Sequence, residues 1–177
     1  MGRGTRNLLL GCGLLIAVLC VCGIGVALLG SQFLGDALAF FSEAVQPYDI
    51  AGRPLPANAQ ANVILPPTVG AYSRLSYGPA AGGGLQAIYS GNDRQVFVTA
   101  VQYSSAGQAQ ARVAQISEET RGSAQMRTTV TGLDPSFVRA IAADGRARMA
   151  WSHGPFFFDV QTDSEAALDE FMTNFPY

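Results

Sequence analysis

The sequence contains no lysine, a single histidine, and no cysteine after position 22. Charged residues make up 14% of the 177 positions, well below the roughly 25% that is typical of soluble domains. The formal net charge of −2 argues against general nucleic-acid binding, which needs a clustered basic surface. The residues after position 22 therefore cannot form a disulfide bond or a thiolate metal site among themselves, and a single histidine excludes a multi-histidine metal site.

Catalytic motifs are scarce as well. Ser152 and His153 are adjacent in the segment WSHGPF and Asp159 follows, but neighbouring side chains do not converge and no G-x-S-x-G motif is present. The glycines at 82–84 lack the P-loop pattern that binds phosphate. Acidic residues fall at expected helix ends, where they act as caps or solvated faces. We therefore predict that the protein is not an enzyme and binds no cofactor.

The most prominent feature that is present is an uncharged apolar run at residues 8–30. As a helix it is long enough to cross a hydrocarbon core of about 30 Å, and it is longer than the roughly 7–15 apolar residues of a cleavable signal peptide. Arg3 and Arg6 precede it without any acidic residue. By the positive-inside rule, residues 1–7 are expected in the cytoplasm. We predict a single-pass protein of the cell membrane with an extracytoplasmic C-terminal domain.

Two kinds of processing are alternatives to a retained anchor. Cys12 follows a Leu-Leu-Gly sequence that is similar to a lipoprotein box, although few apolar residues precede it. Ala37 and Ala39 form an A-x-A pattern typical of signal cleavage, although it lies past the apolar run and past Asp36.

Small residues recur at four-residue spacing within the apolar run, as Gly13 with Ala17 and Gly23 with Ala27. Such pairs allow two membrane helices to approach closely, so this face is a candidate for homodimerisation in the bilayer. The alternative is that glycine and alanine are simply common in membrane spans.

Three segments are expected after the span. Residues 31–45 have apolar side chains at three- and four-residue spacing, which predicts a juxtamembrane helix. Residues 46–67 contain five prolines, which favours an extended linker. The folded extracytoplasmic domain is then expected at residues 68–177.

This domain contains a weak internal repeat. Residues 87–116 and 149–175 each run through a strand, a glycine-containing turn, an apolar strand, a serine-containing cap and a helix. The pattern predicts the α+β class, with an antiparallel sheet and two helices packed on one face. A pseudo-duplicated β-β-β-α unit is one interpretation, and two common motifs in series is the other.

A hairpin is expected over residues 138–151, because Asp144-Gly145 suits a two-residue turn. In that register Arg139, Arg146 and Arg148 share one face. They form a candidate interaction surface for a carboxylate-rich partner, an anionic ligand or lipid headgroups. The alternative is a solvated face whose arginines pair with nearby acids.

Phe157 is a further candidate interaction residue. Alternation along the strand points it away from Phe156 and Phe158. It is expected under a helix, at a dimer contact or on a binding surface.

The first functional hypothesis is a membrane-anchored, non-enzymatic interaction or accessory module. Its expected partners are the lipid bilayer and another membrane or envelope protein, with no nucleic acid. The alternative is an extracytoplasmic domain that binds or senses a small ligand between its sheet and its helices.

Overall fold

The computed structural model describes residues 48–177. The predicted cytoplasmic segment 1–7, the transmembrane helix 8–30 with Gly13, Ala17, Gly23 and Ala27, and the juxtamembrane helix 31–45 all lie outside the described residues. Within residues 48–177, no helix combines the length and the apolar character needed to cross a membrane.

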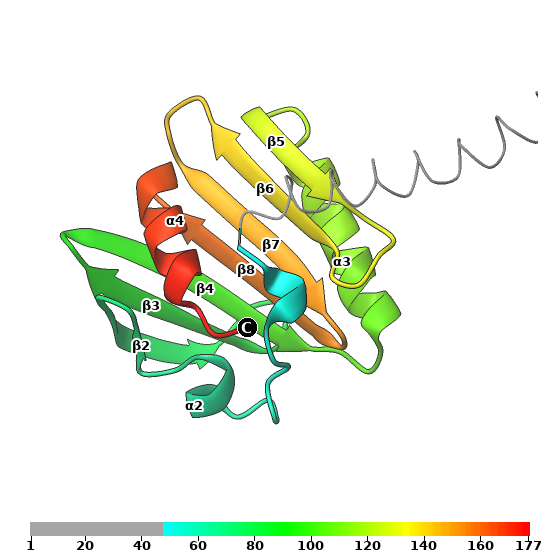
Figure 1. Cartoon of the computed structure of the whole chain (residues 1–177), viewed down its shortest axis with the longest axis horizontal. Coiled ribbons are helices and arrows are strands. Elements are labelled where there is room, and N and C mark those ends of the chain that lie inside the picture. The colour runs from blue at the N-terminus through cyan, green and yellow to red at the C-terminus, as the bar shows by residue number, and fades with distance from the viewer. Residues whose placement is uncertain (1–47) are drawn as a thin grey trace, which may run out of the picture. The chain divides into compact units, whose positions relative to one another are not determined.

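An eight-stranded antiparallel sheet runs through the domain (Figure 1). The strands are β1 (Thr68–Val69), β2 (Tyr72–Pro79), β3 (Leu85–Gly91), β4 (Arg94–Gln102), β5 (Ala124–Val130), β6 (Phe137–Ala142), β7 (Ala147–His153) and β8 (Phe156–Thr162). The helical elements are η1 (Ile50–Gly52), α2 (Ala61–Ile64), α3 (Ala106–Thr120) and α4 (Glu165–Asn174).

The strand order is β1-β2-β3-β4-β8-β7-β6-β5. Two antiparallel meanders therefore meet at the pairing of β4 with β8, where Val98 lies opposite Val160. A helix follows each meander, α3 after β4 and α4 after β8. The predicted α+β class is confirmed, and the order of elements repeats as the sequence pattern indicated.

The two long helices cover opposite faces of the sheet, so the prediction that they share one face is wrong. In Figure 1, α4 lies in front of the sheet and α3 behind it. The reason lies in β7 and β8, which carry buried apolar side chains on both faces. Ala150 and Phe157 point toward α3, whereas Trp151 and Phe158 point away from it. A strand that is apolar on both faces needs a cover on each.

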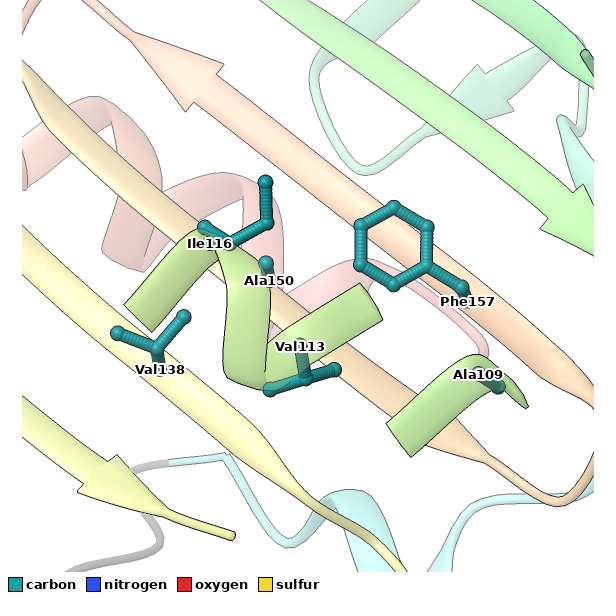
Figure 2. Close-up of a cluster of buried hydrophobic side chains, with 6 residues drawn as sticks. All are labelled: Ala109, Val113, Ile116, Val138, Ala150 and Phe157. Carbon is teal, nitrogen blue, oxygen red and sulfur yellow. The ribbon is translucent and has the colours of Figure 1, made fainter. Parts of the chain in front are cut away.

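Helix α3 begins at the cap Ser105, whose side chain accepts a hydrogen bond from the backbone N–H of Gln108. One stripe of the helix then packs on β6, β7 and β8 (Figure 2). The residues of this interface are Ala109, Val113 and Ile116 of the helix and Val138, Ala150 and Phe157 of the sheet. All six are at most 2% exposed, so this interface is filled by side chains.

Aromatic rings fill the interface between α4 and the sheet. Trp151 stacks on Phe158 with ring centroids 5.0 Å apart, and the edge of Phe175 meets both rings. Phe171 of α4 packs edge-on against Tyr72 and is fully buried. Edge-to-face and offset rings are favourable arrangements for such a core.

The segment expected as a proline-rich linker, residues 46–67, belongs to the domain from Tyr48 onward. Ile50 and Leu65 are fully buried. The Arg53 guanidinium donates to the backbone carbonyls of Met172 and Phe175, at 2.7 Å each. The prolines favour extended backbone, but the apolar residues between them bury against the sheet and α4. The domain therefore begins about twenty residues before the predicted boundary at 68.

Candidate functional site

The hairpin between β6 and β7 has a three-residue loop, not the expected two-residue turn. The N–H of Ala142 donates to the carbonyl of Arg146 at 2.8 Å, and Gly145 adopts a φ of 87°. A type I turn followed by a left-handed residue is typical of such loops. Ile141 consequently lies opposite Ala147. This shift of one residue reverses which face each side chain of β7 points to relative to β6.

The predicted arginine surface is therefore not formed, and Arg139 and Arg148 lie on opposite faces of the sheet. Arg139 lies on the α4 side, where it binds Glu165 at 2.7 Å and Asp169 at 3.0 Å. Its side chain is 12% exposed. Burial lowers its pKa, but the hydrogen bonds from its guanidinium outweigh this effect and raise the pKa overall. Arg139 thus holds α4 to the sheet.

Arg148 lies on the α3 side and makes a bidentate pair with Asp159, at 2.8 and 2.7 Å. Arg146 is separate from both other arginines. It is 73% exposed at the end of the hairpin and pairs with Asp144 at 2.8 Å. Each of the three arginines thus has an acidic partner within its own neighbourhood, and the structure brings no two of them together.

Phe157 lies under α3, which was one of the three positions expected for it. It is 2% exposed and forms part of the interface with Val113 and Ile116 (Figure 2). The guanidinium carbon of Arg112 lies 5.9 Å from the centre of its ring. Phe157 is therefore a core residue of the domain.

The residues around His153 do not form a nucleophile and base arrangement. The side chain of Ser152 lies on the α3 face and accepts the N–H of Ser136 at 3.3 Å. His153 lies on the opposite face, and Asp159 is held by Arg148. Among residues 48–177 no group of three or more potential metal-ligating side chains is gathered.

The notable surface is one that the sequence did not indicate. Helix α3 covers its face of the sheet over β6, β7 and β8, while no helix of the described chain lies behind β2 and β3 in Figure 1. Ser76, Ile88 and Phe97 form one cross-strand row on this uncovered half. Phe97 is 48% exposed there, which is unusual for a phenylalanine in a strand with neighbours on both sides.

A second row, formed by Gly78, Gln86 and Thr99, runs beside the first. The two rows line a hollow of about 390 Å³. We call this surface the open half-face, defined by Ser76, Gly78, Gln86, Ile88, Phe97 and Thr99. None of these residues is charged, and the space beside Gly78 is empty for at least 4 Å around the position of a Cβ atom.

Strand β2, which supplies Ser76 and Gly78 to the open half-face, also exposes two large apolar side chains at the border of the sheet. Leu75 is 63% exposed at a register shift in β2, and Tyr77 is 54% exposed. Strand β1 pairs with β2 only through Val69 and Thr68. The remainder of β2 therefore forms the border of the sheet. Exposed apolar edges of this kind are contact sites for other chains.

One signal in the sequence could have pointed to this surface. The segment QVFVTAVQ is apolar on both sides, which predicts a central strand. The prediction of a central position is confirmed, since β4 lies between β3 and β8. The same reasoning predicts that other elements cover this strand on both faces of the sheet. The described chain covers β4 on the α4 side, but on the opposite face it covers only the end at Val101, which packs against the α3 interface.

Comparisons with known proteins are sparse. No family model matches the chain, and no curated protein sequence matches it. Among solved structures, it is similar to the crystal structure of a GTP binding regulator from Thermotoga maritima, with 13% sequence identity and a TM-score of 0.44. The similarity covers 60% of this chain and 78% of that one. A similarity this distant carries no argument about the function of the chain.

Proposed function

We propose that this chain is a single-pass, membrane-anchored protein whose extracytoplasmic domain is a non-enzymatic interaction module. The domain docks a protein partner on the open half-face. Phe97 and Ile88 supply the apolar contact, and the edge strand β2 borders it.

The exposure of Phe97 on an uncharged, uncovered half of the sheet is the observation that supports this proposal. The cores of protein interfaces are enriched in aromatic side chains and depleted of charge. On this surface the exposed Phe97 and the half-buried Ile88 lie side by side, surrounded by the uncharged Ser76, Gln86 and Thr99. An exposed apolar centre with an uncharged polar border is typical of an interaction site. The residues that line the hollow meet both conditions.

The membrane anchor in this proposal rests on the sequence, through the apolar run at residues 8–30 and the preceding Arg3 and Arg6. Within the domain, Tyr48 is hydrogen-bonded to Asp169 of α4. Tyr48 therefore lies on the α4 side, and the open half-face lies on the other side of the sheet. Another membrane or envelope protein is the expected partner.

The small-ligand alternative is less well supported. It required a cavity between the sheet and a helix, but side chains fill the interfaces of both α3 and α4. The hollow lies on the open sheet, where a small molecule would keep much of its surface in water. Ligand pockets instead bury roughly 70–90% of a ligand.

The test is photo-crosslinking of the full chain in its native membranes. A photoreactive phenylalanine analogue at Phe97 is expected to capture a protein, whereas the same analogue at Thr173, which is exposed on α4, is not. Equal capture from both positions, or none from Phe97, would contradict the proposal. An alkaline wash of the same membranes, followed by N-terminal sequencing, tests whether the anchor is retained.

A further inference from the structure

We infer that the partner on the open half-face is a second copy of this chain. The two sheets pack face to face about a twofold axis that runs along β3. This inference rests on the proposed function, since it names the occupant of the same surface.

The row formed by Ser76, Ile88 and Phe97 provides the geometry. These residues lie on neighbouring strands in one line across the sheet, with Ile88 in the middle. A twofold axis along β3 brings Ile88 against its own equivalent. It also places Phe97 of each copy over Ser76 of the other. In a twofold contact every such pairing occurs twice, so the surface must be complementary to itself.

The side chains of this row meet that requirement in size. Phe97 is large and protrudes, whereas Ser76 and the nearby Gly78 are small and border the hollow. The position beside Gly78 is open, so a ring from the facing sheet has room to enter. Large residues opposite small ones are what interdigitating sheets need when they pack at about 10 Å.

The surface is also complementary to itself in charge. A patch with one sign of charge repels its own copy, but none of the residues lining the hollow is ionisable except Tyr77. On this face Asp159 lies opposite Thr99 and is already paired with Arg148. At the border, the guanidinium carbon of Arg74 lies 4.3 Å from the centre of the Tyr77 ring, and the guanidinium donates to Asn62. Two copies therefore meet without like-charge repulsion.

Helix α3, which projects from the same face, does not block this arrangement. It packs most closely on β7, which lies three strands from β3 and hence about 14 Å from the axis. At the level of the row, β2 is the outermost strand of the facing copy and lies one strand spacing from the axis, about 5 Å, because β1 pairs with β2 only at Tyr72 and Ser73. The remaining gap of about 9 Å matches the usual distance between packed elements. Each α3 then covers the exposed edge of the other copy.

The contact is small, which predicts where it forms. Three strands give a footprint only about 15 Å wide, below the roughly 800 Å² per partner of a standard stable interface. Two copies anchored in one membrane have a raised effective concentration, so the dimer is expected in membranes rather than in dilute solution.

The test is thiol crosslinking of the full chain in native membranes. The native cysteines are first changed by Cys12→Ala, Cys20→Ala and Cys22→Ala. Ile88→Cys is then expected to form a dimer with a short bifunctional thiol reagent. Oxidant alone should not link it, because facing sheets about 10 Å apart exceed the roughly 4.4–6.8 Å between Cα atoms that a disulfide needs.

Two further samples make the geometry specific. Chains carrying Phe97→Cys mixed with chains carrying Ser76→Cys should crosslink to one another. Thr173→Cys, on the α4 side, is the matched control and should remain monomeric. Adding Phe97→Asp to the Ile88→Cys chain should abolish the dimer while the domain stays folded by circular dichroism, since Phe97 is 48% exposed in the monomer.

Failure would be informative in two distinguishable ways. If Ile88→Cys gives no dimer while the photoreactive probe at Phe97 captures a different protein, the second copy is wrong and the docking surface stands. If neither reagent captures anything from Ile88 or Phe97, both the dimer and the proposed function are wrong.

Discussion

At the scale of single residues, the pair of Arg148 and Asp159 illustrates how charge is used in this domain. The Asp159 side chain is 7% exposed and receives two hydrogen bonds from one guanidinium. The charge of Arg148 is therefore neutralised within the fold and is not available to an outside molecule. Arg139 is used similarly against α4. Both arginines tie elements together, whereas the sequence suggested a recognition surface.

A consequence for stability can be measured. Arg148→Ala leaves the buried Asp159 carboxylate without its cation and is expected to lower the free energy of unfolding by about 3–5 kcal/mol. Arg146→Ala removes the same kind of side chain from an exposed pair and should cost less than about 1 kcal/mol. Urea denaturation of both variants makes the comparison, and equal effects would show that Arg148 is not a structural ion pair.

The buried tyrosines make stability depend on pH. Burial, aided by the hydrogen bond to Asp169, raises the pKa of Tyr48 to about 12 from an ordinary value of 10.0. Because folding favours the protonated phenol, this stabilisation is complete below about pH 10 and is lost as the pH rises toward 12. The free energy of unfolding should therefore fall over this range, and less steeply in Tyr48→Phe. Identical slopes for the two proteins would contradict the assignment.

At the scale of elements, strands and helices could be predicted because their signals are local. The stripe of Ala109, Val113 and Ile116 and the alternation in β8 identify elements without any tertiary information. The register of the β6–β7 hairpin could not be predicted in this way, because Asp144-Gly145 suits both a two-residue and a three-residue loop. The loop is one residue longer than predicted, and this difference places Arg139 and Arg148 on opposite faces of the sheet.

Gly145 fixes this register, and its role can be tested by substitution. With a φ of 87° it occupies the left-handed region, and no atom lies within 4 Å of the place that a Cβ atom would take there. Gly145→Ala should therefore cost about 1–2 kcal/mol through backbone conformation alone. Gly122→Ala is the control, since Gly122 has equal space but no positive φ. The free energy of unfolding of Gly122→Ala should be unchanged or slightly raised. If both variants lose the same free energy of unfolding, Gly145 has no special role.

At the scale of the whole molecule, the choice of sheet face and the open half-face were beyond prediction from sequence. Both depend on which strands become neighbours in the sheet. Both also depend on the face of the sheet to which the chain turns after each meander. Phe97 has apolar neighbours in sequence and would be assigned to a core. It is exposed only because α3 crosses toward β7 and leaves β2, β3 and the part of β4 around Phe97 uncovered. The position of α3 relative to β2, β3 and β4 cannot be inferred from the sequence near Phe97.

The segment from Tyr48 to Pro67 is the other feature of this scale, and its attachment to α4 can be tested. Arg53 holds the segment to the carboxyl end of α4 through the carbonyls of Met172 and Phe175. Arg53→Ala removes these charge-assisted hydrogen bonds, which are typically worth about 1.5–3 kcal/mol each. The segment should then detach more often, while the hydrogen bond of Tyr48 to Asp169 and the burial of Ile50 and Leu65 continue to hold it in part.

Limited proteolysis at the exposed residues 57–60 measures this detachment. Cleavage of Arg53→Ala is expected to be faster than that of the unaltered protein. Arg121→Ala provides the control, because Arg121 is exposed and pairs only with Glu118. If both variants are cleaved at the rate of the unaltered protein, Arg53 does not hold the segment. If only Arg53→Ala is cleaved faster, residues 48–67 are held to the domain through the carboxyl end of α4, as the hydrogen bonds of Arg53 indicate.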